Sequence, residues 1–111
     1  MDIFFASRKL QRTFNSENQL CRVYGETRAK IIKRRISVLA EVSNLDQVPK
    51  LPPDKCHALA GERKGQFAVS IGKQFRLIFE PAHDPVPTTE DGGTCLKSIT
   101  SVRILGVEDY H

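Results

Sequence analysis

Cysteine is scarce in this sequence, and its spacing excludes the common cysteine-based frameworks. The 111 residues contain three cysteines, Cys21, Cys56 and Cys95, which lie far apart and form no Cys-x-x-Cys pair. An odd and widely spaced set argues against a disulfide framework and against a zinc site. We therefore expect reduced thiols, with no metal and no cofactor.

Long apolar runs are missing as well. The opening residues, MDIFFASRK, carry an acid at position 2 and only a short apolar run. We therefore expect neither a signal peptide nor a membrane span. These absences predict a cytoplasmic protein that does not contact membranes.

The composition present suits one small basic domain. The length predicts a single domain over residues 1–111, and 40% apolar residues are enough for one core. The net charge is +4 and the pI about 9.2. Such a charge favours an anionic partner, either nucleic acid or an acidic protein, although many small basic domains bind neither.

Helical signals occupy the first part of the chain. Residues 3–6 suit a buried strand, Ser7 can cap a first helix, and Ser16 can cap a second helix that Gly25 ends. The longest helix is predicted over about residues 26–42. Its apolar face consists of Ala29, Ile32, Ile36, Leu39 and Ala40. Its other face consists of Arg28, Lys30, Lys33, Arg34 and Ser37, which suits either a solvated surface or a docking surface for an acidic partner or RNA.

Strand signals occupy the second half. Alternation at residues 67–71 and 75–80, separated by Gly72-Lys73-Gln74, predicts a hairpin. Residues 81–94 are rich in Pro, Gly and acids, which predicts a long mobile loop. A strand is predicted over residues 95–107, with Val102 and Ile104 on one side and Arg103, Leu105 and Val107 on the other.

The order of these elements predicts the fold class. Helices come first and antiparallel strands follow, which indicates an α+β structure with helices packed on one face of a small sheet. The apolar faces of the long helix and the hairpin are expected to cover each other. A central strand near residues 102–107 would also hold the residues that follow it.

The chain finishes with Asp109, Tyr110 and His111, three reactive side chains directly after that strand. Strand alternation puts residues 109 and 111 on one face and residue 110 on the other, unless the strand twists or bulges. A frayed polar terminus is the ordinary alternative.

RNA cleavage by a 2′-hydroxyl needs a base, an acid and a cation beside the phosphate. His57 precedes the hairpin, Arg63 and Lys64 lie in a turn after His57, and Arg76 lies in mid-strand. Histidine titrates near neutral pH, and the guanidinium fork matches phosphate oxygens. Each residue also has an ordinary reading, because His57 suits a structural histidine and Arg76 a solvent-facing arginine. His83, in the 81–94 loop, is expected to be solvent-exposed.

Three stretches together resemble a known toxin family. CHALAGERKGQFAVSI, then FRLIFEP, then the terminal VEDYH are similar to the HigB (plasmid maintenance killer) toxins of the RelE/ParE superfamily. GETRAKIIKRRISVL looks like the family's long helix and IFFASRKLQRTF like its opening strand and helix. The resemblance covers most of the chain, and its specificity comes from the ordered set rather than from any one stretch.

The resemblance implies a function and a set of partners. Such toxins are RelE-like α+β proteins that cut mRNA in the ribosomal A site and are silenced by a cognate HigA-like helix-turn-helix antitoxin in the bacterial cytoplasm. Operator DNA would be reached only through the antitoxin. The family's catalytic positions fall on His57, Arg76, Asp109, Tyr110 and His111. The expected RNA-binding residues are Arg63, Lys64 and Lys73.

Two departures and two alternatives stand beside this interpretation. Many relatives carry lysine where this chain has Ala60, and the 81–94 loop is longer than the family's usual connection. Arg63, Lys64 or Lys73 would have to replace the missing cation. A non-nuclease toxin of the same fold, such as a gyrase inhibitor, and an antitoxin-binding corepressor without catalysis are the alternative functions.

Overall fold

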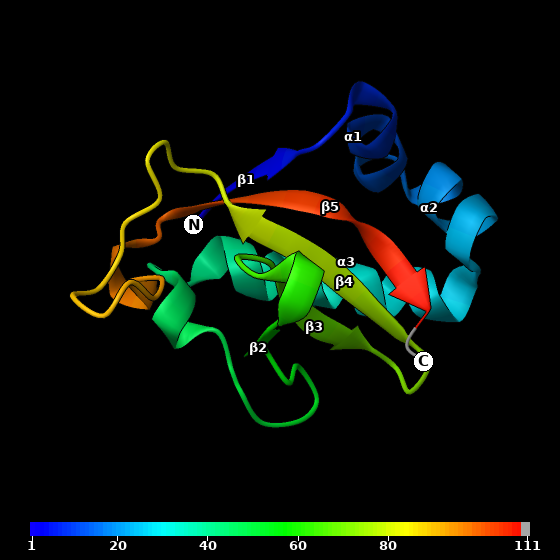
Figure 1. Ribbon diagram of the computed structural model, residues 1–111. Coiled ribbons are helices and arrows are strands. Elements are labelled where there is room, and N and C mark those ends of the chain that lie inside the picture. The colour runs from blue at the N-terminus through cyan, green and yellow to red at the C-terminus, as the bar shows by residue number, and fades with distance from the viewer. Residues whose placement is uncertain (110–111) are drawn as a thin grey trace.

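The computed structural model describes residues 1–109, which form a five-stranded sheet with three α-helices packed beside it (Figure 1). The helices are α1 (Arg8–Asn15), α2 (Glu17–Tyr24) and α3 (Glu26–Glu41). The strands are β1 (Asp2–Phe5), β2 (His57–Ala58), β3 (Phe67–Ile71), β4 (Phe75–Pro81) and β5 (Ser101–Asp109). The 3-10 helices η1 (Leu45–Gln47), η2 (Gly61–Arg63) and η3 (Leu96–Ser98) lie in the connections. The predicted α+β fold is therefore confirmed.

Two serines start the first two helices. Ser7 Oγ accepts a hydrogen bond from the N–H of Leu10 at 3.1 Å, and Ser16 Oγ accepts one from the N–H of Gln19 at 3.2 Å. Each bond satisfies a backbone donor that a helix start leaves without an intrahelical partner. Gly25 follows α2 with φ +88°, a conformation that glycine adopts without steric cost. Both predicted caps and the predicted helix end are confirmed.

α3 covers one face of the sheet, and its buried stripe contains a charge that the sequence did not indicate. The buried residues of α3 are Ala29, Ile32, Arg35 and Leu39. Ala40, predicted to be on this stripe, is exposed because it lies about 100° around the helix from the preceding residue. The predicted polar face is exposed throughout. Within residues 1–109, every helix is too short or too polar to cross a membrane.

The sheet has the order β1-β5-β4-β3-β2, with β1 parallel to β5 and the other pairs antiparallel. The predicted hairpin is confirmed, because β3 and β4 pair along their whole common length. Leu77 and Phe79 of β4 are fully buried on the side that α3 covers. Burial of each such side chain stabilises the fold by roughly 1.5–3 kcal/mol before conformational entropy is subtracted.

A bulge in β5 exchanges the two faces of the strand. The register with β4 shifts between Ile78 and Phe79, which leaves Leu105 as an extra residue. Gly106 beside it has φ +150°, which side chains larger than hydrogen rarely adopt. Val107 therefore packs against the core, although strict alternation predicted that it faces the other way. That prediction was wrong because one extra residue reverses the facing of all residues after it.

The connection before β5 differs from the prediction in two respects. Residues 81–94 do form a long connection, but β5 begins at Ser101 and not at Cys95, because η3 intervenes. His83 was predicted to be solvent-exposed, and it is half-buried. Its Nε2 accepts hydrogen bonds from the N–H groups of Thr100 at 3.0 Å and Ser101 at 3.3 Å. The imidazole thus ties the loop to the start of β5.

Candidate active site

The face of the sheet that α3 leaves uncovered carries charged side chains from two strands. We call it the open face, and its charged residues on β4 and β5 are Arg76, Glu80, Arg103 and Glu108, with Ser70 beside them on β3. In Figure 1, η2 lies in front of this face while α3 lies behind the sheet. His57 and Arg76, two of the predicted catalytic residues, lie on this face.

His57 reaches the open face through β2, a two-residue strand that the sequence did not predict. It pairs with Ala68 of β3, which pairs with Ile78 of β4, and its side chain is exposed. His57 Nδ1 lies 2.9 Å from the carbonyl oxygen of Lys55. A carbonyl oxygen only accepts hydrogen bonds, so Nδ1 carries the hydrogen in this contact. In the neutral ring Nε2 is then the proton acceptor, which is the form a general base requires.

Arg76 lies one row from His57 on the same face. It pairs with Ser70 of β3 and Glu108 of β5, and it precedes by two residues Ile78, the β4 residue that is level with His57. Strands lie about 4.8 Å apart and rise about 3.4 Å per residue, so two strands and two residues separate the Cα atoms of His57 and Arg76 by about 12 Å. Both side chains can therefore approach one phosphodiester placed between them.

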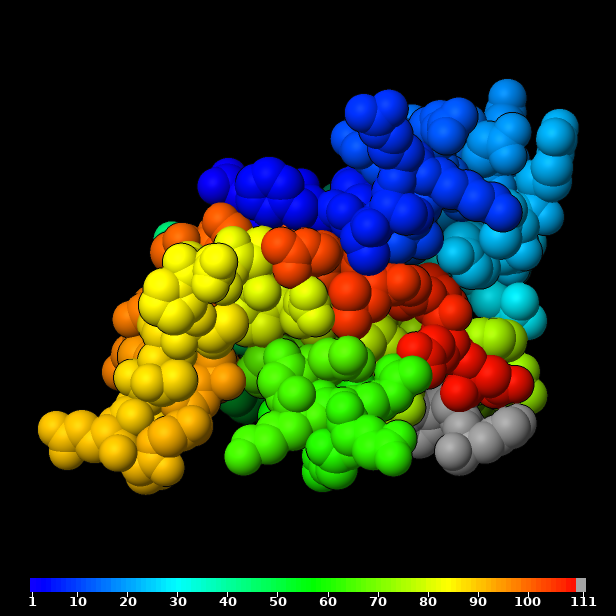
Figure 2. All heavy atoms as spheres, turned by 45° about the horizontal axis from the view of Figure 1, so that its top comes forward, coloured from blue at the N-terminus to red at the C-terminus, as the bar shows by residue number. Residues whose placement is uncertain are grey.

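Arg63, at the end of η2, also reaches the open face and contacts Glu108. Its Nη2 lies 2.7 Å from Glu108 Oε2, and both side chains are a little over one-third exposed. Figure 2 shows the segment around residue 63 and the end of β5 side by side on the surface. Glu108 thus lies opposite Arg76 in the sheet register and forms an ion pair with Arg63.

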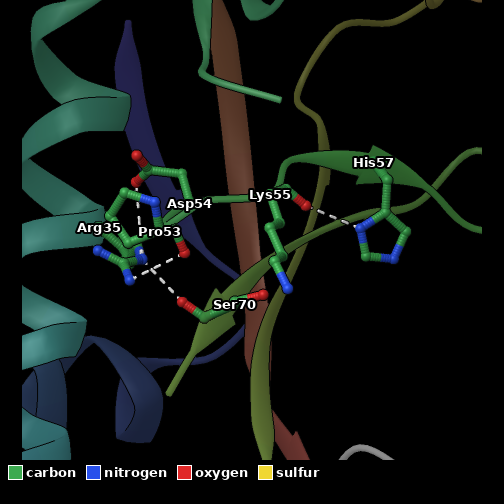
Figure 3. Close-up of polar contacts among 6 residues, drawn as sticks. All are labelled: Arg35, Pro53, Asp54, Lys55, His57 and Ser70. Carbon is green, nitrogen blue, oxygen red and sulfur yellow. Dashed lines mark hydrogen bonds and ion pairs between the residues drawn. The ribbon is translucent and has the colours of Figure 1, made fainter. Parts of the chain in front are cut away.

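A cleft of about 540 Å³ opens next to His57 and Ser70. Among the described residues, the ionisable groups that line it are all basic or neutral: Arg35, Lys55, His57 and Lys73. In Figure 3 the Lys55 side chain extends toward Ser70, with His57 on one side and Arg35 on the other. Such a lining favours an anion, and a nucleotide phosphate fits that charge.

Lys64 is separated from this cleft. It lines a different groove of about 480 Å³, together with mainly apolar residues of the 58–67 segment and with Thr94 and Leu96. Figure 2 shows this hollow between the segment around residue 60 and the loop that precedes β5. Of the three predicted RNA-binding residues, Lys73 therefore lines the cleft of His57, Arg63 reaches Glu108, and Lys64 lies apart.

The terminal residues are only partly described. Asp109 ends β5, is exposed and pairs with Phe75. Because of the bulge, its side chain starts on the face that α3 covers, whereas Glu108 starts on the open face. Tyr110 and His111 were predicted as catalytic residues and lie outside the described residues.

Three residues of this region were not anticipated. Glu108 escaped notice because its partner Arg63 is 45 positions away and the bulge that turns it outward is not visible in the alternation. Lys55 could have been found from the sequence, because it places a positive charge two residues before His57. Arg35 was hidden in a helix stripe of otherwise apolar spacing. Within the part of the chain that the structure describes, three or more His, Cys, Asp or Glu residues nowhere gather in a way that would hold a metal ion.

Comparison with known proteins identifies the fold. The sequence matches no protein-family model and no curated protein. A YoeB/ParE toxin from Agrobacterium tumefaciens superposes over 100% of both chains with a TM-score of 0.57 and 10% identity. YoeB from Staphylococcus aureus, solved as a YoeB–YefM complex and as a dimer, gives TM-scores of 0.55 and 0.54 at 13% identity, over 100% of this chain and 97% of each neighbour. The chain therefore has the fold of the YoeB/ParE toxin structures.

Proposed function

We propose that this protein is the toxin of a type II toxin–antitoxin system, of the HigB type, and cleaves mRNA on the ribosome. One observation carries the proposal: His57, with Nε2 as its proton acceptor, shares the open face with Arg76 beside a basic cleft. The likeness to YoeB and YoeB/ParE toxin structures supports the toxin role. The bacterial cytoplasm is the location that this role requires.

The proposed reaction is an internal phosphoryl transfer. A base removes the proton of a ribose 2′-hydroxyl, the 2′-oxygen bonds to the adjacent phosphorus, and the bond from phosphorus to the 5′-oxygen breaks. An acid protonates the departing 5′-oxygen, which leaves a 2′,3′-cyclic phosphate and a 5′-hydroxyl. His57 or His111 is the base, and the other histidine or Tyr110 is the acid. Asp109 orients one of these partners.

Cations supply the electrostatic part of the reaction. Arg76 is proposed to stabilise the extra negative charge that develops on the phosphate oxygens, as a guanidinium does without losing its own proton. Lys55 and Lys73 line the cleft and take the place of the lysine that many relatives carry where this chain has Ala60. Arg63 would exchange its contact with Glu108 for a phosphate oxygen when RNA binds, and Lys64 would bind RNA outside the cleft.

A cognate HigA-like helix-turn-helix antitoxin is the proposed regulatory partner. One structural neighbour, YoeB of Staphylococcus aureus, was solved in complex with YefM, which supports a protein partner for this fold. The net charge of +4 suits an acidic segment of that partner. Contact with operator DNA would pass through the antitoxin.

Induced expression with mapping of mRNA 5′ ends tests the nuclease. We expect new 5′ ends in translated messages for the wild type, and their loss with Arg76→Ala, His57→Gln and deletion of residues 109–111. Arg103→Ala is the matched control, because Arg103 lies on the same face but pairs with Glu80 at 2.7 Å, away from the cleft.

Other outcomes separate the alternatives. Growth arrest with intact mRNA and DNA-damage signalling would indicate a gyrase-type toxin and reject the nuclease. Absence of growth arrest without the partner would indicate an antitoxin-binding corepressor. Full toxicity after Arg76→Ala combined with the terminal deletion would also reject the proposed chemistry.

A further inference from the structure

A buried arginine on α3 is connected to His57 through the backbone. Arg35 is 8% exposed, and its guanidinium points away from the helix toward the residues between α3 and β2. Arg35 Nε donates to the carbonyl oxygen of Ser70 at 2.7 Å, and Nη2 donates to that of Pro53 at 3.1 Å. The carboxylate of Asp54, itself buried, lies 3.6 Å from Nε. Figure 3 shows these contacts on one side of Ser70.

The segment held in this way leads directly to the imidazole. The N–H of Ser70 donates to the carbonyl oxygen of Asp54 at 2.8 Å, so residues 53 and 54 are fixed to both α3 and β3. Lys55 follows, and its carbonyl oxygen accepts the hydrogen bond from His57 Nδ1. The carbonyl group that sets the tautomer of His57 therefore belongs to the residue that directly follows the two arginine-bound residues.

Lys55 is itself in an unfavourable conformation. Its φ is +50°, in the left-handed region that residues other than glycine rarely adopt. This conformation is sterically unfavourable and persists only where the surrounding contacts enforce it. The Lys55 N–H donates to the carbonyl oxygen of Leu51 at 3.1 Å and the Cys56 N–H to that of Pro49 at 3.0 Å, and Arg35 holds the two residues before Lys55. A lysine would not fix the same three acceptors, the carbonyl oxygens of Ser70 and Pro53 and the carboxylate of Asp54, because only a guanidinium holds several donors in one plane.

We propose that Arg35 is a positioning residue for His57: by holding Pro53 and Asp54 it keeps the Lys55 carbonyl opposite Nδ1 and so keeps Nε2 unprotonated. Arg35 does not touch the substrate in this scheme. The structural part of the inference concerns the tautomer alone, and its effect on RNA cleavage rests on the proposed function. The two parts are measured separately.

The first measurement is the tautomer of His57 in the isolated protein. Long-range ¹H–¹⁵N correlation spectra of ¹⁵N-histidine-labelled protein at about pH 8, where imidazoles are largely neutral, distinguish the two ring nitrogens. We expect the Nδ1–H tautomer in the wild type. In Arg35→Lys we expect a shift toward the Nε2–H tautomer, which predominates in an unconstrained imidazole. Arg34→Lys changes the exposed neighbouring arginine and should leave the spectrum as it is in the wild type.

His83 provides an internal reference in the same spectra. Its Nε2 accepts two backbone N–H groups, so it too is protonated at Nδ1, but by contacts far from Arg35 in the chain. The His83 signals should stay unchanged in Arg35→Lys. If that variant does not fold, Asp54→Asn, which removes the carboxylate beside Arg35, takes its place with the same expected shift.

A folded Arg35→Lys or Asp54→Asn protein with wild-type His57 signals overturns the inference, as does an Nε2–H tautomer in the wild type. With His57 as the base of mRNA cleavage, Arg35→Lys should lower kcat roughly 10- to 100-fold with little change in KM, because a protonated Nε2 cannot accept the 2′-hydroxyl proton while the cations remain. If the tautomer shifts as expected in the variant but the wild type cuts no mRNA, the proposed function is refuted and the positioning role remains intact.

Discussion

Arg76 and Leu77 are neighbours in β4 and face opposite sides of the sheet. Leu77 is fully buried against the layer of α3, whereas Arg76 is half-buried on the open face between Ser70 and Glu108. The face that α3 covers is mainly apolar, and the open face carries ion pairs that join distant segments. The comparison teaches that stability and the proposed chemistry are assigned to alternate residues of the same strands, so that they can be disrupted separately.

The largest effect is expected from the buried side. Leu77→Ala removes a fully buried side chain and leaves a cavity, so the free energy of unfolding should fall by about 2–5 kcal/mol. Urea denaturation measures this loss. The fraction that remains folded should cleave mRNA at the wild-type rate. A cleavage rate per folded molecule that is clearly below that of the wild type would contradict the separation between the two faces.

The adjacent residue should show the reverse. Arg76→Ala should lower the rate of mRNA cleavage by about 10²–10³-fold, because a donor to the developing phosphate charge is lost. Its free energy of unfolding should change less than that of Leu77→Ala in the same urea titration. Arg103→Ala, on the same face, should retain cleavage, and equal losses for the two arginines would show that the open face has no localised site.

Cys56 gives a chemical measure of the covered side. Burial raises the pKa of the Cys56 thiol to about 11, with a lowering effect of Lys50 and a further raising effect of Asp54. The ordinary pKa of such a thiol is 9.0, so the unfolded chain loses this proton first, and the stabilisation that is present below about pH 9 is lost as pH rises through about 11. Alkylation by iodoacetamide at about pH 8, followed by mass spectrometry, should modify Cys56 more slowly than Cys21 or Cys95, which are less buried. Equal rates would mean that this edge of the core opens readily.

The smallest change in stability is expected at the ion pair of the open face. Glu108→Gln should alter the free energy of unfolding by less than about 1 kcal/mol, because both side chains of the pair are partly exposed. It should nevertheless tighten binding of single-stranded RNA a few-fold at low salt, since Arg63 is no longer neutralised. Fluorescence anisotropy measures the binding. Glu80→Gln breaks the equally short pair with Arg103 and should leave RNA affinity unchanged.

The sequence predicted the elements that depend on near neighbours. Ser7 and Ser16 cap the helices that follow them by accepting the N–H three residues ahead, and the alternation of residues 67–80 specifies a hairpin through one tight turn. These features need only local geometry, which the sequence displays directly.

What the sequence did not predict depends on distant partners or on a single irregular residue. The extra residue at Leu105 is invisible in an apolar run, although Gly106 beside it was a signal that the strand is irregular. Arg35 occupies a position where helical spacing indicates only burial, and its acceptors lie 18 and 35 residues away. His57 and Arg76 were identified by residue type and resemblance, and their common face follows from a register that only the paired strands define.

The position of β5 has a consequence for the order in which the sheet assembles. β1 is an edge strand whose neighbour in the described sheet is β5, and Asp2 pairs with Ser101, 99 residues later. During synthesis the first apolar strand therefore remains without its sheet partner until almost the entire described chain has been translated. A nascent chain of this topology cannot present a finished open face, because the ribosome must first complete residues 101–109, which supply Arg103 and Glu108 to that face.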